Sequence, residues 1–309
     1  PHTATSVVVG GDMGVFQVLG FAVAKQMHAD FENSTEGYPD AVAFLGDQSY
    51  AGIDTNIPFV MNKSDQIDQI WDWWVQQNAF VTSKVPSIYV VGNHELLAPP
   101  SQSTLLAFDS KFSSPCASSP SNIGLNNRWF AWKVGNLKFI VLSSESDYSP
   151  SSAQNAWFLK ELKATEQDTS TAHTIVTIHR PIYAADASEW NDHKPGAPID
   201  KFVETAIDAH PNARVRLVLC GHQHEYERAD PSKNGTHIQH ATTINGNTVY
   251  ENPTYPVYLT IGSMGALQEE SYVNPVPAWS AVRAANTLTS YGYGRITAPN
   301  STHIHFKFH

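Results

Sequence analysis

The segment AVAFLGDQSY, residues 41–50, ends a short apolar run in Gly46-Asp47 and places Tyr50 three residues after the aspartate. An apolar run of this length predicts a buried strand, and the Gly-Asp pair predicts its carboxyl end. Four comparable runs occur at residues 6–10, 87–92, 173–179 and 214–222. The sequence therefore predicts several buried strands that each deliver polar residues at one end.

Helical patterns separate these runs. Apolar residues recur at helical spacing over residues 15–31, and helices are also expected near 153–164 and 198–210. Another helix follows Ser64, which suits an N-cap position. Its predicted core face comprises Ile67, Ile70, Trp71, Trp74 and Val75. Strands that alternate with helices indicate a layered α/β architecture.

Two dipeptides, Gly135-Asn136 and Asn245-Gly246, predict hairpin turns between further strands. The chain shows no internal repeat, long linker or break in composition. Residues 1–309 are therefore predicted to form a single domain.

Bulk composition excludes several classes of partner. The chain has a net charge of −10, no block of Lys and Arg, and no apolar run that approaches the ~18 residues of a transmembrane helix. A nucleic-acid or anionic-membrane partner is therefore not expected. The two cysteines, Cys116 and Cys220, are too few for a disulfide scaffold. Cys220 closes an apolar run and is expected to be a buried free thiol.

Four Asn-x-Ser/Thr sequences are candidate glycosylation sites, at Asn33, Asn62, Asn234 and Asn300. They favour a secreted, extracellular or vacuolar protein whose signal peptide lies outside this chain.

The polar residues that follow the predicted strands form one constellation. Because the carboxyl ends of strands in an open α/β sheet share one edge, these side chains are expected to converge. The candidate metal ligands are Asp12, Asp47, Tyr50, Asn93, His179, His222 and His224. Seven such groups, with one shared carboxylate, suffice for two metal ions that hold both oxygens of an in-line phosphoryl displacement. Imidazole and carboxylate ligands suit Zn, Fe and Mn.

This ordered set resembles the calcineurin-like metallophosphoesterases over nearly the whole chain, and within them the purple acid phosphatases. The segment HQHEYER, residues 222–228, is similar to the plant and fungal branch. The resemblance implies a four-layer αββα sandwich of two mixed β-sheets flanked by helices. It also implies that the separate N-terminal β-domain of the large plant enzymes is missing here, because Asp12 follows the first strand almost at once.

Many relatives carry Asp-x-His at the first motif, whereas this chain has Asp12-Met13-Gly14. The resemblance implies that Tyr50 supplies the missing ligand, as a phenolate that favours Fe(III). Asp12, Asp47, Tyr50 and His224 would then hold Fe(III), and Asp47 would bridge to a divalent ion, which is Zn, Fe or Mn. The implied ligands of that second ion are Asn93, His179 and His222.

The implied activity is hydrolysis of phosphate monoesters by attack of a metal-bound hydroxide. Small phosphorylated substrates are expected, and phytate, nucleotides, phosphoproteins and sugar phosphates all remain open. A phosphodiesterase or nucleotide pyrophosphatase on the same fold is the alternative enzyme. A binding protein that has lost the chemistry is a third reading, although all seven ligand positions are present here.

The residue that protonates the leaving group is not fixed by the resemblance. His94 matches the family histidine that contacts phosphate. Relatives place a His or a His-Glu pair about nine residues after the counterpart of His179, where this chain has Ser188 and Glu189. His193 is the first candidate for the general acid and Glu189 the second. His193, Asn93 and Tyr183 are candidate substrate contacts, with core packing as the alternative for Tyr183. His237 and His240 are expected to be structural residues of a hairpin.

Overall fold

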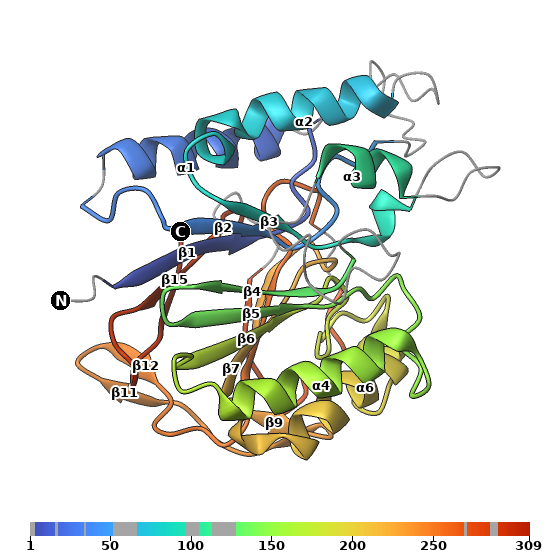
Figure 1. The fold of residues 1–309 in the computed structure, drawn as a ribbon, viewed down its shortest axis with the longest axis vertical. Helices are drawn as coiled ribbons and strands as arrows, with labels where there is room; N and C mark the ends of the chain where they lie inside the picture. Colours follow the sequence, from blue (N-terminus) through green and yellow to red (C-terminus); the bar gives the residue numbers. More distant parts are fainter. Residues whose placement is uncertain are drawn as a thin grey trace.

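Two β-sheets lie face to face between two layers of helices (Figure 1). The computed structural model describes residues 4–15, 18–33, 35–51, 67–96, 105–112, 128–268, 271–284 and 290–309. This arrangement is the four-layer sandwich that the resemblance to the metallophosphoesterases implies, and it confirms the layered α/β architecture predicted from the sequence.

The first sheet has five strands in the order β16-β15-β1-β2-β3. Strands β1, β2 and β3 are parallel, whereas β15 is antiparallel to both β1 and β16. Because both of their faces are covered, β1 and β2 read as continuous apolar runs, whereas the outer strand β16 alternates polar and aromatic residues. The bounds are β1 (Thr5–Gly10), β2 (Ala41–Phe44), β3 (Ser87–Tyr89), β15 (Gly294–Ala298) and β16 (His305–Phe308).

The second sheet has seven strands in the order β14-β8-β13-β7-β6-β5-β4. Its four central strands β13, β7, β6 and β5 are parallel, and the flanking strands are antiparallel to their neighbours. The bounds are β4 (Phe130–Val134), β5 (Leu137–Val141), β6 (His173–Thr177), β7 (Val215–Cys220), β8 (Tyr226–Ala229), β13 (Val257–Ile261) and β14 (Ser280–Ala284).

Two small hairpins complete the described strands. They are β9 (Ser232–Lys233) with β10 (Thr236–His237), and β11 (Thr242–Ile244) with β12 (Asn247–Val249). Both predicted turns are confirmed, since Gly135-Asn136 joins β4 to β5 and Asn245-Gly246 joins β11 to β12. Cys220 is a buried free thiol, as predicted, while Cys116 lies outside the described residues.

The helices divide between the outer faces. In Figure 1, α1 (Val18–Asn33) and α2 (Ile67–Thr82) cover the five-stranded sheet, and α4 (Ala153–Gln167) and α6 (Pro198–Ala209) cover the seven-stranded sheet. Shorter helices are α3 (Leu106–Lys111) and α5 (Trp190–His193). No helix among the described residues combines the length and the apolar character needed to cross a bilayer.

Three apolar layers hold the sandwich together. Val7 and Val9 of β1 pack between the sheets, against residues such as Phe139 and Leu219. Val8 points the other way, into the layer under α1 and α2. The third layer lies between the seven-stranded sheet and the α4–α6 pair. Tight packing on both sides of each sheet fixes where the strands end, and so fixes the loops that follow them.

The prediction of the buried face of α2 is wrong at one position. Ile70, Trp71 and Trp74 of α2 are buried as expected, but Val75 is 39% exposed and Asn78 is buried. The cause is the helical repeat, because a residue one position after Trp74 is turned about 100° away from it, whereas one four positions on returns to the same face. The predicted N-cap, Ser64, lies outside the described residues.

Candidate metal centre

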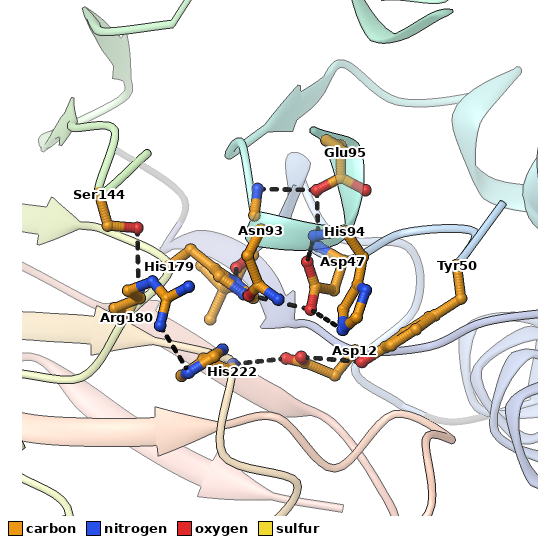
Figure 2. Close-up of polar contacts among 12 residues, drawn as sticks. Asp12, Asp47, Tyr50, Asn93, His94, Glu95, Ser144, His179, Arg180 and His222 are labelled. Carbon is orange, nitrogen blue, oxygen red and sulfur yellow. Dashed lines mark hydrogen bonds and ion pairs between the residues drawn. The ribbon is translucent and has the colours of Figure 1, made fainter. Parts of the chain in front are cut away.

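The polar residues predicted from the strand ends meet at one edge of the sandwich. Asp12, Asp47, Tyr50 and Asn93 come from loops after strands of the five-stranded sheet, and His179, His222 and His224 follow β6 and β7 of the other sheet. Figure 2 shows most of these side chains pointing into a common space. Hydrogen bonds, ion pairs and ring contacts link all seven of them, so the sequence-based grouping corresponds to a cluster in the structure.

One part of the cluster joins Asp12, Tyr50 and His224. The phenol O–H of Tyr50 lies 3.1 Å from Oδ1 of Asp12 and 2.8 Å from Nε2 of His224. The same Nε2 lies 3.6 Å from Oδ1 of Asp12. The other ring nitrogen of His224 contacts the backbone carbonyl of Leu267 at 2.6 Å. A ring nitrogen, a carboxylate oxygen and a phenol oxygen therefore face one point.

A second part joins Asp47, Asn93, His179 and His222. Nε2 of His179 lies 3.1 Å from Oδ1 of Asn93 and 3.3 Å from Oδ2 of Asp47. Nδ1 of His179 contacts the carbonyl oxygen of Leu45 at 2.8 Å, which leaves Nε2 directed at the cluster. His222 offers a ligand atom within 4.8 Å of those of Asp47 and His179.

Asp47 lies where the two parts could share a ligand. Its Oδ1 accepts a hydrogen bond from the backbone N–H of His94 at 2.8 Å. Its Oδ2 is buried and has no hydrogen-bond partner among the described residues, although the nearest imidazole nitrogens lie 3.3 and 3.7 Å away. A buried carboxylate oxygen without a donor is costly unless a cation binds it. The cluster therefore fits a metal ion.

Four of these residues have a left-handed backbone. The φ angles are 61° at Asp12, 49° at Asp47, 55° at Tyr50 and 70° at His222. Asp and His tolerate this region, but a bulky residue such as tyrosine rarely adopts it. Each strand thus turns sharply at its end, and this turn directs the ligand side chain back over the sheet edge. Strain of this kind is typical of functional sites.

Two glycines make room for the carboxylates. A Cβ atom on Gly92 would lie 2.2 Å from Oδ1 of Asp47, and one on Gly221 would lie 2.5 Å from Oδ2 of Asp12. Any side chain at either position would displace a candidate ligand. The glycines of the GNHE and CGHQH motifs are therefore required by the cluster itself.

The electrostatics of the cluster call for a cation. Burial and the carboxylates of Asp12 and Asp47 raise the pKa of Tyr50 well above its ordinary value. Burial alone would lower the pKa of His179, but the Asp47 carboxylate outweighs it and raises that pKa to about 10. A ring proton on His179 thus neutralises Asp47 when nothing else does. A metal ion would replace that proton and would favour the phenolate of Tyr50.

Sequence reasoning missed Glu95, the last residue of the GNHE motif. Its side chain is 5% exposed, and its carboxylate accepts hydrogen bonds from the backbone N–H groups of Asp47 (2.8 Å), Gln48 (3.0 Å) and Gly92 (2.7 Å). Burial and the charge of Asp47 raise the pKa of Glu95 to about 8. Glu95 therefore holds the loop that carries Asp47 in place (Figure 2). A buried acid directly after a ligand motif is the signal that could have revealed it.

Arg180, next to the candidate ligand His179, was also missed. Its Nη1 lies 3.2 Å from Nε2 of His222, and its Nε donates to Oε1 of Glu145 at 2.8 Å. Figure 2 shows the guanidinium beside His222 at the margin of the cluster. A fixed guanidinium at this position could contact an anion bound at the cluster.

The two candidate acids form a pair, with Glu189 nearer to the cluster. Oε2 of Glu189 lies 2.6 Å from Nε2 of His222 and 3.2 Å from Nε2 of His193. His193 is 1% exposed, and its Nδ1 contacts the carbonyl oxygen of Pro181 at 3.0 Å. Hydrogen bonds from His193 and His222 hold the pKa of Glu189 well below its ordinary value. His193 therefore lies behind Glu189 rather than at the surface of the site.

The remaining predicted substrate contacts differ in position. The ring of His94 lies over Tyr50, with centroids 4.7 Å apart, and its side chain is 25% exposed beside the cluster. Tyr183 lies in the apolar core, and its hydroxyl donates to the buried Glu204. Tyr183 is therefore a core residue, which is the alternative given above to its role as a substrate contact.

Comparisons with known proteins agree with this geometry. Residues 6–226 match the calcineurin-like phosphoesterase family. The chain belongs to that family. Residues 255–309 also match the family described as iron/zinc purple acid phosphatase-like protein C. Within the calcineurin-like phosphoesterases, the chain resembles the purple acid phosphatases, as the motifs predict.

Two curated relatives illustrate the likeness. Purple acid phosphatase 1 of Ipomoea batatas is 29% identical over 286 residues, which cover 90% of this chain and 54% of that protein. Fe(3+)-Zn(2+) purple acid phosphatase 12 of Arabidopsis thaliana is 28% identical over 281 residues, which cover 88% of this chain and 54% of that protein. The chain thus spans about half the length of the curated relatives it matches.

A solved structure supports the fold. The purple acid phosphatase isolated from yellow lupin (Lupinus luteus) seeds has a TM-score of 0.77 and 19% sequence identity, and the match covers 100% of this chain and 52% of that one. At this identity the similarity establishes the fold alone.

Proposed function

We propose that this protein hydrolyses phosphate monoesters as a purple acid phosphatase with a binuclear metal centre. The observation that carries the proposal is the division of the cluster into two contacting sets around Asp47. Asp12, Tyr50 and His224 form one set, and Asn93, His179 and His222 form the other. Each set contains residues that follow strands of both sheets.

The donor chemistry supports two different ions. The set with Tyr50 offers phenolate and carboxylate oxygens together with one imidazole, which suits Fe(III). The set with Asn93 offers two imidazoles and an amide oxygen, which suits Zn, Fe or Mn in the divalent state. The name of the Arabidopsis relative gives the pair Fe(3+) and Zn(2+) for that protein. When bound, the ions would supply Lewis-acid activation of water and of the phosphoryl group.

The chain's own residues would bind and orient the phosphate. His94 and Arg180 lie on either side of the cluster, and each can donate a hydrogen bond to a phosphate oxygen. Glu145 accepts a hydrogen bond from Nε of Arg180 and so fixes the guanidinium, while Nη1 of Arg180 lies beside His222. This arrangement would bind the substrate at the junction of the two sets.

Glu189 and His193 would deliver the proton to the leaving group. Glu189 is the member that can approach a substrate, because its side chain is 39% exposed whereas that of His193 is 1% exposed. Nε2 of His193 lies 3.2 Å from Oε2 of Glu189, which is close enough for a proton to pass between the two side chains. We therefore assign Glu189 to the contact with the leaving group and His193 to its support.

A direct test combines metal analysis with hydrolysis assays. The purified protein should contain close to two metal ions per chain, including iron, and should release phosphate from an aryl phosphate faster than it cleaves the matching diester. A faster rate on the diester would assign the chain to the phosphodiesterases. A protein with both metals and no hydrolysis of either ester would identify a binding protein instead.

We further propose that the protein is secreted or vacuolar and carries N-linked glycans. Asn33, Asn234 and Asn300 are exposed, so a glycan can be attached at each without disturbing the core. The fourth acceptor, Asn62, lies outside the described residues. Treatment of the protein from its native source with an endoglycosidase should lower its mass. An unchanged mass would contradict the proposal.

A further inference from the structure

A second group of metal-binding side chains lies at the opposite end of the seven-stranded sheet. Strand β8 begins two residues after His224 and runs away from the candidate metal centre, and Asp230 follows its last residue. His237 ends the short strand β10, and His240 lies three residues further on. The β9–β10 hairpin lies between Asp230 and His240 in the chain, and β9 appears in the lower part of Figure 1. The function proposed above uses none of them.

The three side chains converge on one carboxylate oxygen. Nε2 of His237 and Nδ1 of His240 each lie 3.2 Å from Oδ2 of Asp230. In a tetrahedral zinc site with bonds of about 2.0–2.1 Å, neighbouring ligand atoms are about 3.3 Å apart. The two measured separations therefore match two edges of such a site. The three ligand atoms also all lie within 4.8 Å of one another.

The surroundings of Asp230 resemble those of a metal ligand. Asp230 is 4% exposed, and its other oxygen, Oδ1, accepts a hydrogen bond from the hydroxyl of Tyr250. Ligating carboxylates are commonly oriented by a partner of this kind. Nε2 of His237 is buried and has no hydrogen-bond partner among the described residues. A buried imidazole nitrogen directed at a buried carboxylate is left unsatisfied unless a proton or a metal ion lies between them.

His240 would adjust its position on binding. Its ring is stacked on that of His237 with centroids 3.6 Å apart, which is closer than two imidazoles that point at one tetrahedral ion can be. The side chain of His240 is 76% exposed, so its ring can tilt outward without disturbing the core. That exposure also leaves a coordination position open to water.

We propose that Asp230, His237 and His240 bind one Zn²⁺ ion at a site separate from the candidate binuclear centre. Two imidazoles and one carboxylate form a common protein ligand set for zinc, with water in the fourth position. The ion would attach the β9–β10 hairpin to the end of β8, because Asp230 directly follows β8, His237 lies in the hairpin and His240 lies just after it. This site does not depend on the proposed phosphatase activity.

The test uses the metal-loaded protein. Its metal content is measured first, and Zn²⁺ is then titrated calorimetrically at pH 7.5 into the wild-type protein, His240→Ala and the control His305→Ala. His305 is an exposed histidine on β16 of the other sheet. The wild type and the control should each take up one further Zn²⁺ per chain. His240→Ala should bind that ion at least ~10-fold more weakly, since loss of even a residue that supports a ligand costs about 10–100-fold.

Thermal unfolding provides a second measurement, which does not depend on the number of Zn²⁺ ions counted per chain. Excess Zn²⁺ should raise the unfolding temperature of the wild type and of His305→Ala, because an ion that binds only the folded state stabilises it. His240→Ala should show a clearly smaller rise, and Mg²⁺ should give none because it disfavours imidazole ligands. The proposal is overturned if the wild type takes up no further Zn²⁺, or if His240→Ala binds Zn²⁺ as tightly as the wild type does.

Discussion

The phenol oxygen of Tyr50 lies 2.8 Å from Nε2 of His224, although 174 residues separate them in the chain. Tyr50 lies in the loop after β2 of the five-stranded sheet, and His224 lies in the loop after β7 of the seven-stranded sheet. The same is true of Asn93 and His179, which are 3.1 Å apart. Each of the two sets of ligands therefore combines residues from both sheets. A metal ion bound to either set would link the two sheets.

Tyr50→Phe tests the proposed iron site. If Tyr50 binds Fe(III) as a phenolate, the purified protein should show a broad visible absorption band that this substitution removes. Metal content has to be measured in parallel, because zinc in both positions would also give a colourless protein. An active wild type that contains iron yet lacks the band would contradict the assignment of Tyr50.

Asp47→Ala and Asn93→Ala test how the ligands are divided. Asp47 is proposed to contact both ions, so its loss should lower the occupancy of both metals and reduce turnover by more than the ~10–100-fold associated with residues that merely support a ligand. Asn93→Ala should lose mainly the divalent metal. Elemental analysis of both variants distinguishes these results. Equal loss of the two metals in both variants would show that the division is incorrect.

Glu189→Gln and His193→Ala test the delivery of the proton. An aryl leaving group needs little protonation and an alkyl leaving group needs much, so the rate on a simple alkyl phosphate should fall far more than the rate on a nitrophenyl ester. General acid catalysis contributes about 10²–10⁴-fold, which sets the size of the difference for Glu189→Gln. His193→Ala should give a smaller difference of the same kind. Equal losses on both esters in Glu189→Gln would transfer the role to another group.

Glu95→Gln tests the support of the Asp47 loop. The substitution replaces one carboxylate oxygen with an NH₂ group that faces backbone N–H donors, so at least one buried hydrogen bond is lost. The free energy of unfolding should fall by about 1–3 kcal/mol, and metal affinity should weaken. Urea unfolding and metal titration measure the two effects. Glu251→Gln, which changes an exposed glutamate between β12 and β13, is the control, and an equally small effect of both substitutions would contradict this role.

Asp200 in α6 should make stability depend on pH. Burial and the neighbouring Glu204 raise the pKa of Asp200 to about 7, compared with about 3.9 in an unfolded chain. Between these values the folded state holds a proton that the unfolded state has released, so this contribution to stability is present below pH ~4 and is lost as the pH rises through 7. Asp200→Asn should therefore lose less stability than the wild type between pH 5 and 8.

Urea midpoints at several pH values measure this difference. Asp68→Asn, which changes an exposed aspartate in the first turn of α2, should retain the pH dependence of the wild type. Parallel curves for the wild type and Asp200→Asn would show that Asp200 is ionised in the folded protein throughout this range.

The strand ends could be predicted from the sequence because each apolar run stops abruptly at a glycine or a polar ligand. The positions of Glu189 and His193 could not be predicted in the same way. Both lie on the loop and short helix after His179, and their order relative to the cluster depends on how four residues of α5 turn. Glu95 was missed for a related reason. The bond between Glu95 and Gly92 is local, but those to Asp47 and Gln48 span 48 and 47 residues of the chain. Only folding brings these two loops together.

The position of β1 has a consequence for synthesis of the protein. β1 pairs with β2 on one side and with β15 on the other, so its second neighbour, Gly294–Ala298, is made long after the strand itself. A growing chain must therefore keep the edge of β1, with Val7, Val8 and Val9, from pairing with other chains until β15 has left the ribosome. Premature termination before Gly294 is expected to yield an aggregating fragment rather than a shorter working protein.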